Sequence, residues 1–154
     1  MSNRALDGAA IYFDCADKTL CLYYLSNSRF QNNTAIRKGG AYAFDIFPPT
    51  VNNLTLLNNN AVYGPNRAGY PYRIVNSTDP TLLTYVSGQP ILEEMRFSLV
   101  DSFGETIKTD SESVFTISAK AGGAAAKVIG NTDVTVTEGI GLFKDITFIV
   151  APGT

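Results

Sequence analysis

Apolar residues occur along this chain in short runs, with no stripe at the spacing of a helix. In the C-terminal half, from Ile91 onward, apolar and polar residues alternate. A period of two is typical of a half-buried strand, because successive side chains point to opposite faces. Gly, Asp and Asn turns separate the runs, so the pattern predicts a small antiparallel sandwich over residues 91–154. The alternating apolar positions are Met95, Phe97 and Leu99, then Phe115, Ile117 and Ala119, then Val134 and Val136, and finally Ile146, Phe148 and Val150.

A repeated pattern organises the N-terminal half. Its clearest copy spans 28–44, where an apolar residue is followed by Asn-x-Ala, a Gly pair, and small and aromatic residues. Less complete copies of the pattern lie upstream and downstream, which gives Asn3, Asn33 and Asn60 as the repeated asparagines. A period of about thirty residues indicates stacked supersecondary units, each too small to bury its own apolar face.

Each repeated unit is predicted to form one coil of a parallel β-helix, in which strands of successive coils pair about 4.8 Å apart. Asparagine suits the turns, because it tolerates left-handed backbone angles and its side chains can stack into hydrogen-bonded ladders. Glycine suits tight corners where a Cβ would clash. The sequence therefore predicts about three coils, with their C-terminal cap, over residues 1–75.

A change of composition marks the boundary between the two halves. Residues 65–90 are dense in Pro, Gly, Asn and Ser, so we expect a capping segment followed by a linker over 76–90. A cap is expected because the last coil otherwise leaves a free strand edge. The tyrosines of this region either pack the cap or form a sugar-stacking platform. They are Tyr63, Tyr70, Tyr72 and Tyr85.

Charge and composition limit the partners. The chain has 154 residues, 45% of them hydrophobic, and a formal net charge of −2. Nucleic acid and anionic membranes attract basic patches, so neither is expected as a main partner. No apolar run approaches the roughly 18 residues that span a bilayer, and no signal peptide opens the chain. We therefore expect a segment that lacks its own export signal.

The two cysteines, Cys15 and Cys21, lie close together in sequence, and the chain has no histidine. A structural metal site needs about four Cys or His ligands, so no metal or other cofactor is expected. A short-loop disulfide would indicate an oxidising compartment. The alternative is a pair of buried thiols.

Three Asn-x-Ser/Thr sequons point to the same compartment. Their acceptors are Asn32, Asn53 and Asn76, each in a turn-like context where N-glycosylation could occur. Together with the cysteine pair they predict an extracellular or cell-surface glycoprotein, as a segment cut from a longer parent.

A family resemblance adds to this interpretation. Phe30-x-x-Asn33-x-Ala35 followed by 39–42 resembles the repeat of polymorphic outer-membrane-protein-type β-helices, members of the pectin-lyase-like superfamily. The run 60–71 resembles the end of the β-helix in very large ciliate-type surface proteins, where an immunoglobulin-like module follows; here 87–90, the Val-Asp-x-x-Gly turn 100–104 and the closing run 138–148 are similar to that module. The resemblance implies a short right-handed parallel β-helix followed by an immunoglobulin-like sandwich. Ala9 departs from it, because a second Gly is usual there.

The predicted function is structural and non-enzymatic: a segment or subunit of a glycosylated surface scaffold or filament. It would assemble through β-helix ends and sandwich edges, by self-association or against neighbouring domains of its parent. An adhesion or glycan-binding module is the alternative, and Asp101 and Asp110 could then help to hold calcium, although turn formation explains both.

A polysaccharide-cleaving enzyme is less favoured, because such chemistry needs clustered carboxylates and fold alone does not carry function. The carboxylates of the coil region are more simply turn residues or solvated positions. They are Asp7, Asp14, Asp17 and Asp45.

Overall fold

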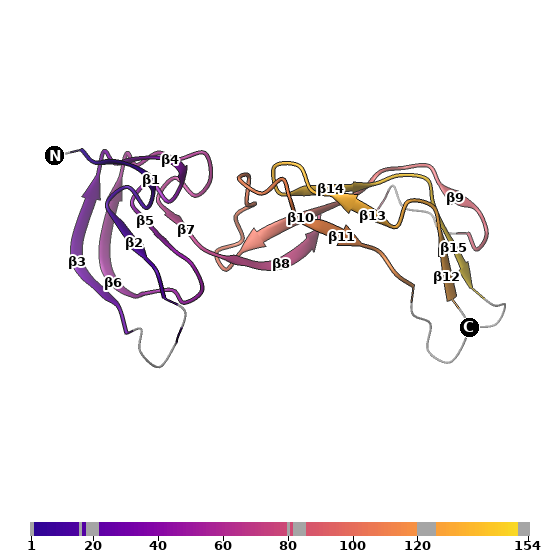
Figure 1. The fold of residues 1–154 in the computed structure, drawn as a ribbon, viewed down its shortest axis with the longest axis horizontal. Helices are drawn as coiled ribbons and strands as arrows, with labels where there is room; N and C mark the ends of the chain where they lie inside the picture. The colour runs from indigo at the N-terminus through magenta and orange to yellow at the C-terminus, as the bar shows by residue number, and fades with distance from the viewer. Residues whose placement is uncertain are drawn as a thin grey trace. The chain divides into compact units, whose positions relative to one another are not determined.

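The computed structural model describes residues 2–15, 17, 22–79, 81, 86–119 and 126–150. Every regular strand or helix assigned in these ranges is a β-strand, so the predicted all-β class is confirmed. Contacts divide the chain into two compact units (Figure 1). The first holds Met1–Arg73 together with Val100–Thr109, and the second holds Ile74–Leu99 together with Asp110–Thr154.

The first unit is built from parallel sheets. Two of these sheets have two strands each, β1-β4 and β3-β6, and the third has three strands in the order β2-β5-β7 (Figure 1). The strands are β1 (Arg4–Asp7), β2 (Ile11–Phe13), β3 (Tyr24–Gln31), β4 (Thr34–Lys38), β5 (Tyr42–Phe44), β6 (Thr50–Leu57) and β7 (Arg67–Ala68).

Three stretches of chain therefore stack on one another in the first unit. We name them the first repeat (3–31), the second repeat (33–57) and the third repeat (59–68). Each strand of the first repeat pairs with its counterpart in the second. The third repeat continues two of the rows, through the bridges Thr34↔Asn60 and Lys38↔Tyr63 and through β7. The periodicity predicted from sequence is thus a stacking of chain segments in parallel register.

The register corrects one assignment made from the sequence. Thr34 pairs with Asn60, so the counterpart of Asn33 is Asn59 and not Asn60. A side-chain hydrogen bond between Asn33 and Asn59 agrees with this register. The three consecutive asparagines at 58–60 made the choice ambiguous in sequence.

The predicted glycine corner is present. Gly39 has a φ of +70°, the left-handed region that favours glycine, and its counterparts Gly8 and Gly64 share that conformation. At Gly40 a Cβ would lie 2.0 Å from the Pro65 carbonyl oxygen in the third repeat. Close approach of successive repeats therefore requires glycine at position 40.

The core of the first unit lies between its sheets. It contains the buried residues Phe13, Leu25, Ala41, Tyr42 and Phe44. Half-buried apolar side chains complete it, and one of them, Phe103, comes from the segment Val100–Thr109. The sequence placed the cap within 65–90, whereas Phe103 comes from later in the chain.

The second unit consists of small sheets whose assigned pairings are antiparallel. The alternating runs found in sequence lie in or beside β10, β11, β13 and β15. β10 pairs with β14, β11 with β13, and β15 with both β12 and β9. The strands that lie wholly in this unit are β9 (Pro90–Ile91), β11 (Val114–Thr116), β12 (Ala126–Ile129), β13 (Asp133–Thr135), β14 (Ile140–Phe143) and β15 (Ile146–Val150). Two more strands, β8 (Pro71–Asn76) and β10 (Met95–Asp101), are divided between the two units, after Arg73 and after Leu99.

Aromatic packing fills the second unit. The rings of Phe97 and Phe143 meet edge to face, with centroids 5.7 Å apart. Phe115 is buried against Gly141, where a Cβ would lie 2.4 Å from the Phe115 ring. The sequence division into 1–75, 76–90 and 91–154 stays a prediction, and it did not anticipate that Val100–Thr109 groups with the first unit.

Candidate functional site

A ladder of asparagine side chains links the three repeats. Asn33 is 3% exposed, and both its backbone N–H and its Nδ2 donate to Asn59 Oδ1, at 3.1 and 3.0 Å. Asn33 Oδ1 in turn accepts the backbone N–H of Asn3 at 3.2 Å. The same contact is thus made between the first and second repeats and between the second and third.

The ladder is closed off beyond Asn59. Asn59 Nδ2 donates to the carbonyl oxygen of Phe30 and to Asn66 Oδ1, both at 3.1 Å. A buried amide without partners is unfavourable, so these bonds make the asparagines structural rather than available to a ligand. The residues most strongly repeated in sequence are therefore occupied in joining one repeat to the next.

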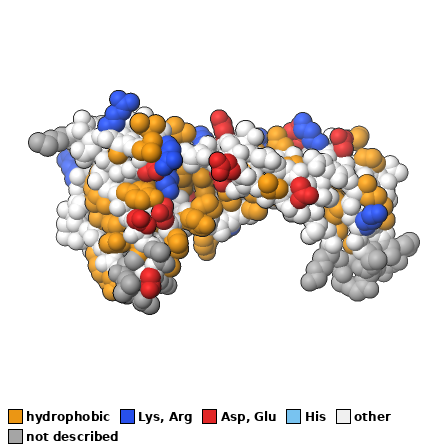
Figure 2. Space-filling view, in the orientation of Figure 1, with side chains coloured by type: hydrophobic (Ala, Val, Ile, Leu, Met, Phe, Trp, Pro, Cys, Tyr) orange, Lys and Arg blue, Asp and Glu red, His pale blue; other side chains and the backbone are white. Residues whose placement is uncertain are grey.

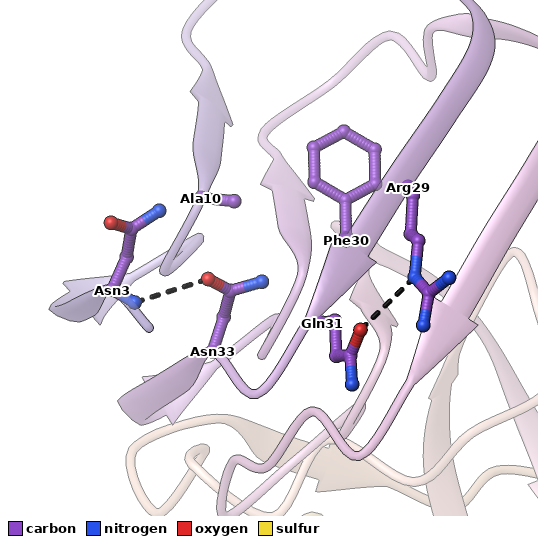
Figure 3. A pocket seen from close by; sticks show the side chains of 6 residues that line it. All are labelled: Asn3, Ala10, Arg29, Phe30, Gln31 and Asn33. Atoms are coloured by element: carbon purple, nitrogen blue, oxygen red, sulfur yellow. Dashed lines mark hydrogen bonds between the residues drawn. The ribbon is translucent and has the colours of Figure 1, made fainter. Parts of the chain in front are cut away.

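The first repeat leaves a hollow at its outer end. The hollow has a volume of about 440 Å³ and is lined by Asn3, Ala10, Arg29, Phe30, Gln31 and Asn33 (Figure 3). The backbone N–H of Asn3, and not its side chain, makes the bond to Asn33. Arg29 Nε donates to Gln31 Oε1 at 3.0 Å. Within the described residues, β1, β2 and β3 each have a partner strand on one side only.

The third repeat is covered by the segment Val100–Thr109. Asp101 is 0% exposed, and its carboxylate accepts four hydrogen bonds. Two come from its own segment, the N–H groups of Phe103 at 2.9 Å and Glu105 at 3.0 Å. The other two come from the third repeat and the residue just after it: the hydroxyl of Tyr63 at 2.7 Å and the N–H of Gly69 at 3.1 Å. A fully hydrogen-bonded carboxylate can be buried without an uncompensated charge.

Aromatic contacts join the same two pieces. The Phe103 ring meets Phe44 edge to face, with centroids 5.7 Å apart. The guanidinium of Arg67, on β7, lies 4.1 Å from the Phe103 ring centroid, a favourable cation–π distance. Burial, followed by the hydrogen bond to Asp101 and the charge of Asp101, raises the pKa of Tyr63 far above its ordinary value, so Tyr63 stays a neutral donor.

Two carboxylates of the first unit, Asp7 and Asp45, are engaged in charged or hydrogen-bonded pairs. Asp7 accepts from both Arg37 Nε and Nη2, and Asp45 contacts Lys38 Nζ and the hydroxyl of Tyr12. On the face of the molecule in Figure 2, acidic and basic side chains are interspersed with apolar ones. These pairs offer no cluster of carboxylates at the spacing that glycoside hydrolysis needs. Asp14 is exposed, and the backbone oxygen of Asp17 lies 3.4 Å from Cys15 Sγ.

The predicted modification sites are partly described. Cys15 is buried, whereas Cys21 lies outside the described residues, so their disulfide stays a prediction. Asn32, Asn53 and Asn76 are all exposed. Asn53 Nδ2 donates to Asn27 Oδ1 at 2.8 Å in the neighbouring strand, and Asn76 Oδ1 accepts the N–H of Thr78 at 2.9 Å. N-glycosylation of these side chains also stays a prediction.

The two proposed calcium ligands belong to different units. Asp101 belongs to the first unit and is saturated by protein donors, while Asp110 belongs to the second and accepts from Glu112 and Ser113. The described part of the chain holds no group of three or more Cys, His, Asp or Glu that could bind a metal ion. Turn formation therefore explains the hydrogen bonds of the Asp110 carboxylate. For Asp101 it explains two of the four, those from Phe103 and Glu105.

The four tyrosines do not share one platform. Tyr63 is buried beside Asp101, while Tyr70 and Tyr72 are exposed and Tyr85 lies outside the described residues.

An apolar cavity of about 130 Å³ lies in the second unit, lined by Ile74, Phe97, Phe115, Thr116, Ile117 and Phe143. No helix among the described residues is long and apolar enough to cross a membrane.

Sequence reasoning missed the contact between Asp101 and the third repeat. The Val-Asp-x-x-Gly turn marked Asp101 as a turn residue, but nothing local indicates a partner 38 residues earlier in the chain. The one available signal was Tyr63, an aromatic residue at the position that Lys38 occupies in the second repeat.

Comparison of the chain with family models, with curated proteins and with solved structures finds no match.

Proposed function

We propose that this chain is a non-enzymatic structural segment of an extracellular surface scaffold or filament. The first unit would be the end of a right-handed parallel β-helix of about three coils, and the second an immunoglobulin-like sandwich. Its partners would be further copies of the chain or neighbouring domains of a longer parent.

One observation carries the proposal: the asparagine ladder runs through all three repeats and reaches an outer edge at Asn3. Asn33 Oδ1 accepts the N–H of Asn3 just as Asn59 Oδ1 accepts that of Asn33. Asn3 holds the equivalent register position in the first repeat, so we expect its side-chain oxygen to accept the N–H of one more repeat. Strand edges of this kind pair readily with another chain.

The engaged carboxylates support a structural role over a catalytic one. Asp7 and Asp45 are each held by a cation, and the buried Asp101 is saturated by donors. A general acid or base must reach a substrate in a cleft, and these groups are committed to the fold.

Electron microscopy of the native material, with intact mass measurement on the same sample, tests the proposal. The expected result is ordered assemblies built from a chain heavier than 16.6 kDa by whole glycans. A monodisperse and unmodified monomer would contradict both the assembly and the extracellular glycoprotein assignment.

Exposure of Tyr70 and Tyr72 favours one alternative, a glycan-binding module. Exposed aromatic rings can stack on sugar rings. A glycan panel tests this: binding lost in both Tyr70→Ala and Tyr72→Ala, with the fold retained, would favour adhesion, and no binding by the unaltered chain would exclude it.

A further inference from the structure

The outer edge of the third repeat is the place where a fourth repeat would add. Tyr42 donates its N–H to the Asn66 carbonyl oxygen, that is, toward the third repeat. In a parallel ladder, residues two apart direct their N–H groups to the same neighbour. Arg67 is the partner of Tyr42 in β7, and because Tyr42 bonds to the residues on either side of Arg67, the N–H of Arg67 points away from the second repeat. Gly69 follows two residues later, so its N–H also points away from the second repeat.

Asp101 occupies that place. Its Oδ2 accepts the N–H of Gly69 at 3.1 Å, where the carbonyl oxygen of a further strand would otherwise bind. The same oxygen accepts the Tyr63 hydroxyl at 2.7 Å, and Tyr63 belongs to the third repeat. A side-chain carboxylate thus substitutes for the backbone of a following repeat.

Phe103 completes the cover. It lies edge to face on Phe44 in the core and under the Arg67 guanidinium of β7. The turn that presents it is fixed by Asp101 Oδ1, which accepts the N–H groups of Phe103 and Glu105. One residue therefore both shapes the segment Val100–Thr109 and attaches it to the third repeat.

We propose that the segment Val100–Thr109 is a stop for repeat stacking: Asp101 closes the third-repeat end, so that a second copy of the chain cannot stack there. Covering a sheet edge with a loop is an established way of preventing edge-to-edge association. This inference rests on the proposed function, and it leaves the first-repeat ends as the edges through which two copies meet. Its consequence is that release of the segment exposes an edge that fits the open first repeat of a second copy.

Two variants release the segment, and one controls for them. Asp101→Asn keeps the shape of the side chain but replaces an accepting oxygen by a donor, and Tyr63→Phe removes a single hydroxyl. The matched control is Asp110→Asn, which alters a carboxylate with similar turn contacts in the second unit. Hydrogen exchange of the Gly69, Phe103 and Glu105 amides should accelerate by roughly tenfold or more in the two releasing variants. The same amides should be unchanged in the control.

Sedimentation velocity and electron microscopy of the full chain then report stacking. The releasing variants should form larger species than the unaltered chain, and adding Ala10→Lys, which places a charge in the first-repeat hollow, should suppress them. Unchanged hydrogen exchange in Asp101→Asn would contradict the attachment of the segment Val100–Thr109 through Asp101. Accelerated exchange without larger species would overturn the stop, while assembly of the unaltered chain, and with it the proposed function, would be unaffected. Larger species that persist with Ala10→Lys would be unspecific aggregates and would also overturn it.

Should Asp101→Asn fail to fold, the milder Tyr63→Phe carries the test alone. That variant retains three of the four hydrogen bonds to the Asp101 carboxylate. Its larger species must likewise disappear when Ala10→Lys is added, and growth without that dependence counts against the proposal.

Discussion

The outer strands of the first repeat and those of the third repeat present similar backbone edges, yet their surroundings differ. The first-repeat end has a hollow lined by polar side chains around Ala10 and Phe30. At the third-repeat end, the buried carboxylate of Asp101 binds the N–H of Gly69, and the Phe103 ring packs against Phe44 and the Arg67 guanidinium. The difference indicates that repeat stacking by itself is permissive, and that a specific segment is needed to end it.

A second comparison separates what holds each unit together. The first unit relies on close approach of backbones, through Asn33 and the glycines at 39 and 40. The second relies on aromatic side chains of alternating strands, such as Phe97 and Phe143. Substitutions should therefore act through backbone spacing in one unit and through packing volume in the other.

The largest effect is expected from Gly40→Ala. Its Cβ would meet the Pro65 carbonyl oxygen at 2.0 Å and the Asn60 nitrogen at 2.7 Å, so the repeats must move apart. We expect a loss of about 3 kcal/mol or more in the free energy of unfolding, measured by chemical denaturation. Gly88→Ala is the control in the second unit, where no atom lies within 4 Å and only the positive φ acts. A cost of about 1 kcal/mol is expected there, and equal costs at the two sites would contradict the close-approach account.

A smaller effect separates the buried ladder from an exposed one. Asn33→Ala leaves the part-buried contacts to Asn3 and Asn59 unmade, so it should cost about 1–2 kcal/mol. Asn27→Gly removes the exposed bond from Asn53 Nδ2 and keeps a residue that tolerates the φ of +48° at this position. Water can replace the lost partner there, so this change should cost less than about 0.5 kcal/mol. Thermal denaturation of both variants measures the difference. A larger cost at Asn27 would show that burial does not decide the strength of the ladder.

The smallest effect is a pH dependence at the closed end. The raised pKa of Tyr63 means that the folded chain keeps the phenol proton to a higher pH than the unfolded chain, whose tyrosines titrate near 10.0. This contribution to stability is complete below that pH and is lost as the pH rises above it. At one pH unit above 10.0, the free energy of unfolding of Tyr63→Phe should have fallen by about 1 kcal/mol less than that of the unaltered chain. Denaturant titrations across this range check it, with the exposed Tyr70→Phe expected to behave as unaltered; equal slopes in all three would contradict the buried contact.

Much of the fold could be predicted from particular residues. Alternation at 95–99 and 146–150 matches β10 and β15, and the Asn33, Gly39 and Gly40 pattern matches a stacked repeat. Local pattern suffices there because strand periodicity and left-handed corners depend on neighbouring residues.

The rest depended on contacts that no local pattern encodes. Asn59 could not be distinguished from Asn60, since register is set by pairing with another repeat. Asp101 has the sequence context of a turn, and its burial depends on Tyr63 and Gly69, which lie 38 and 32 residues earlier. The candidate site at the closed end was therefore invisible in the sequence, while the repeat that leads to the open end was visible.

Sedimentation velocity of three chains tests the central claim that copies stack through the first-repeat end. The chains are the unaltered protein, Ala10→Lys in the first-repeat hollow, and Leu92→Lys at an 84% exposed position of the second unit, which carries the same change of charge. The account predicts assemblies for the unaltered protein and for Leu92→Lys, and a monomer for Ala10→Lys. Assemblies of the same size in all three chains, or an unaltered protein that is itself monomeric, would contradict it.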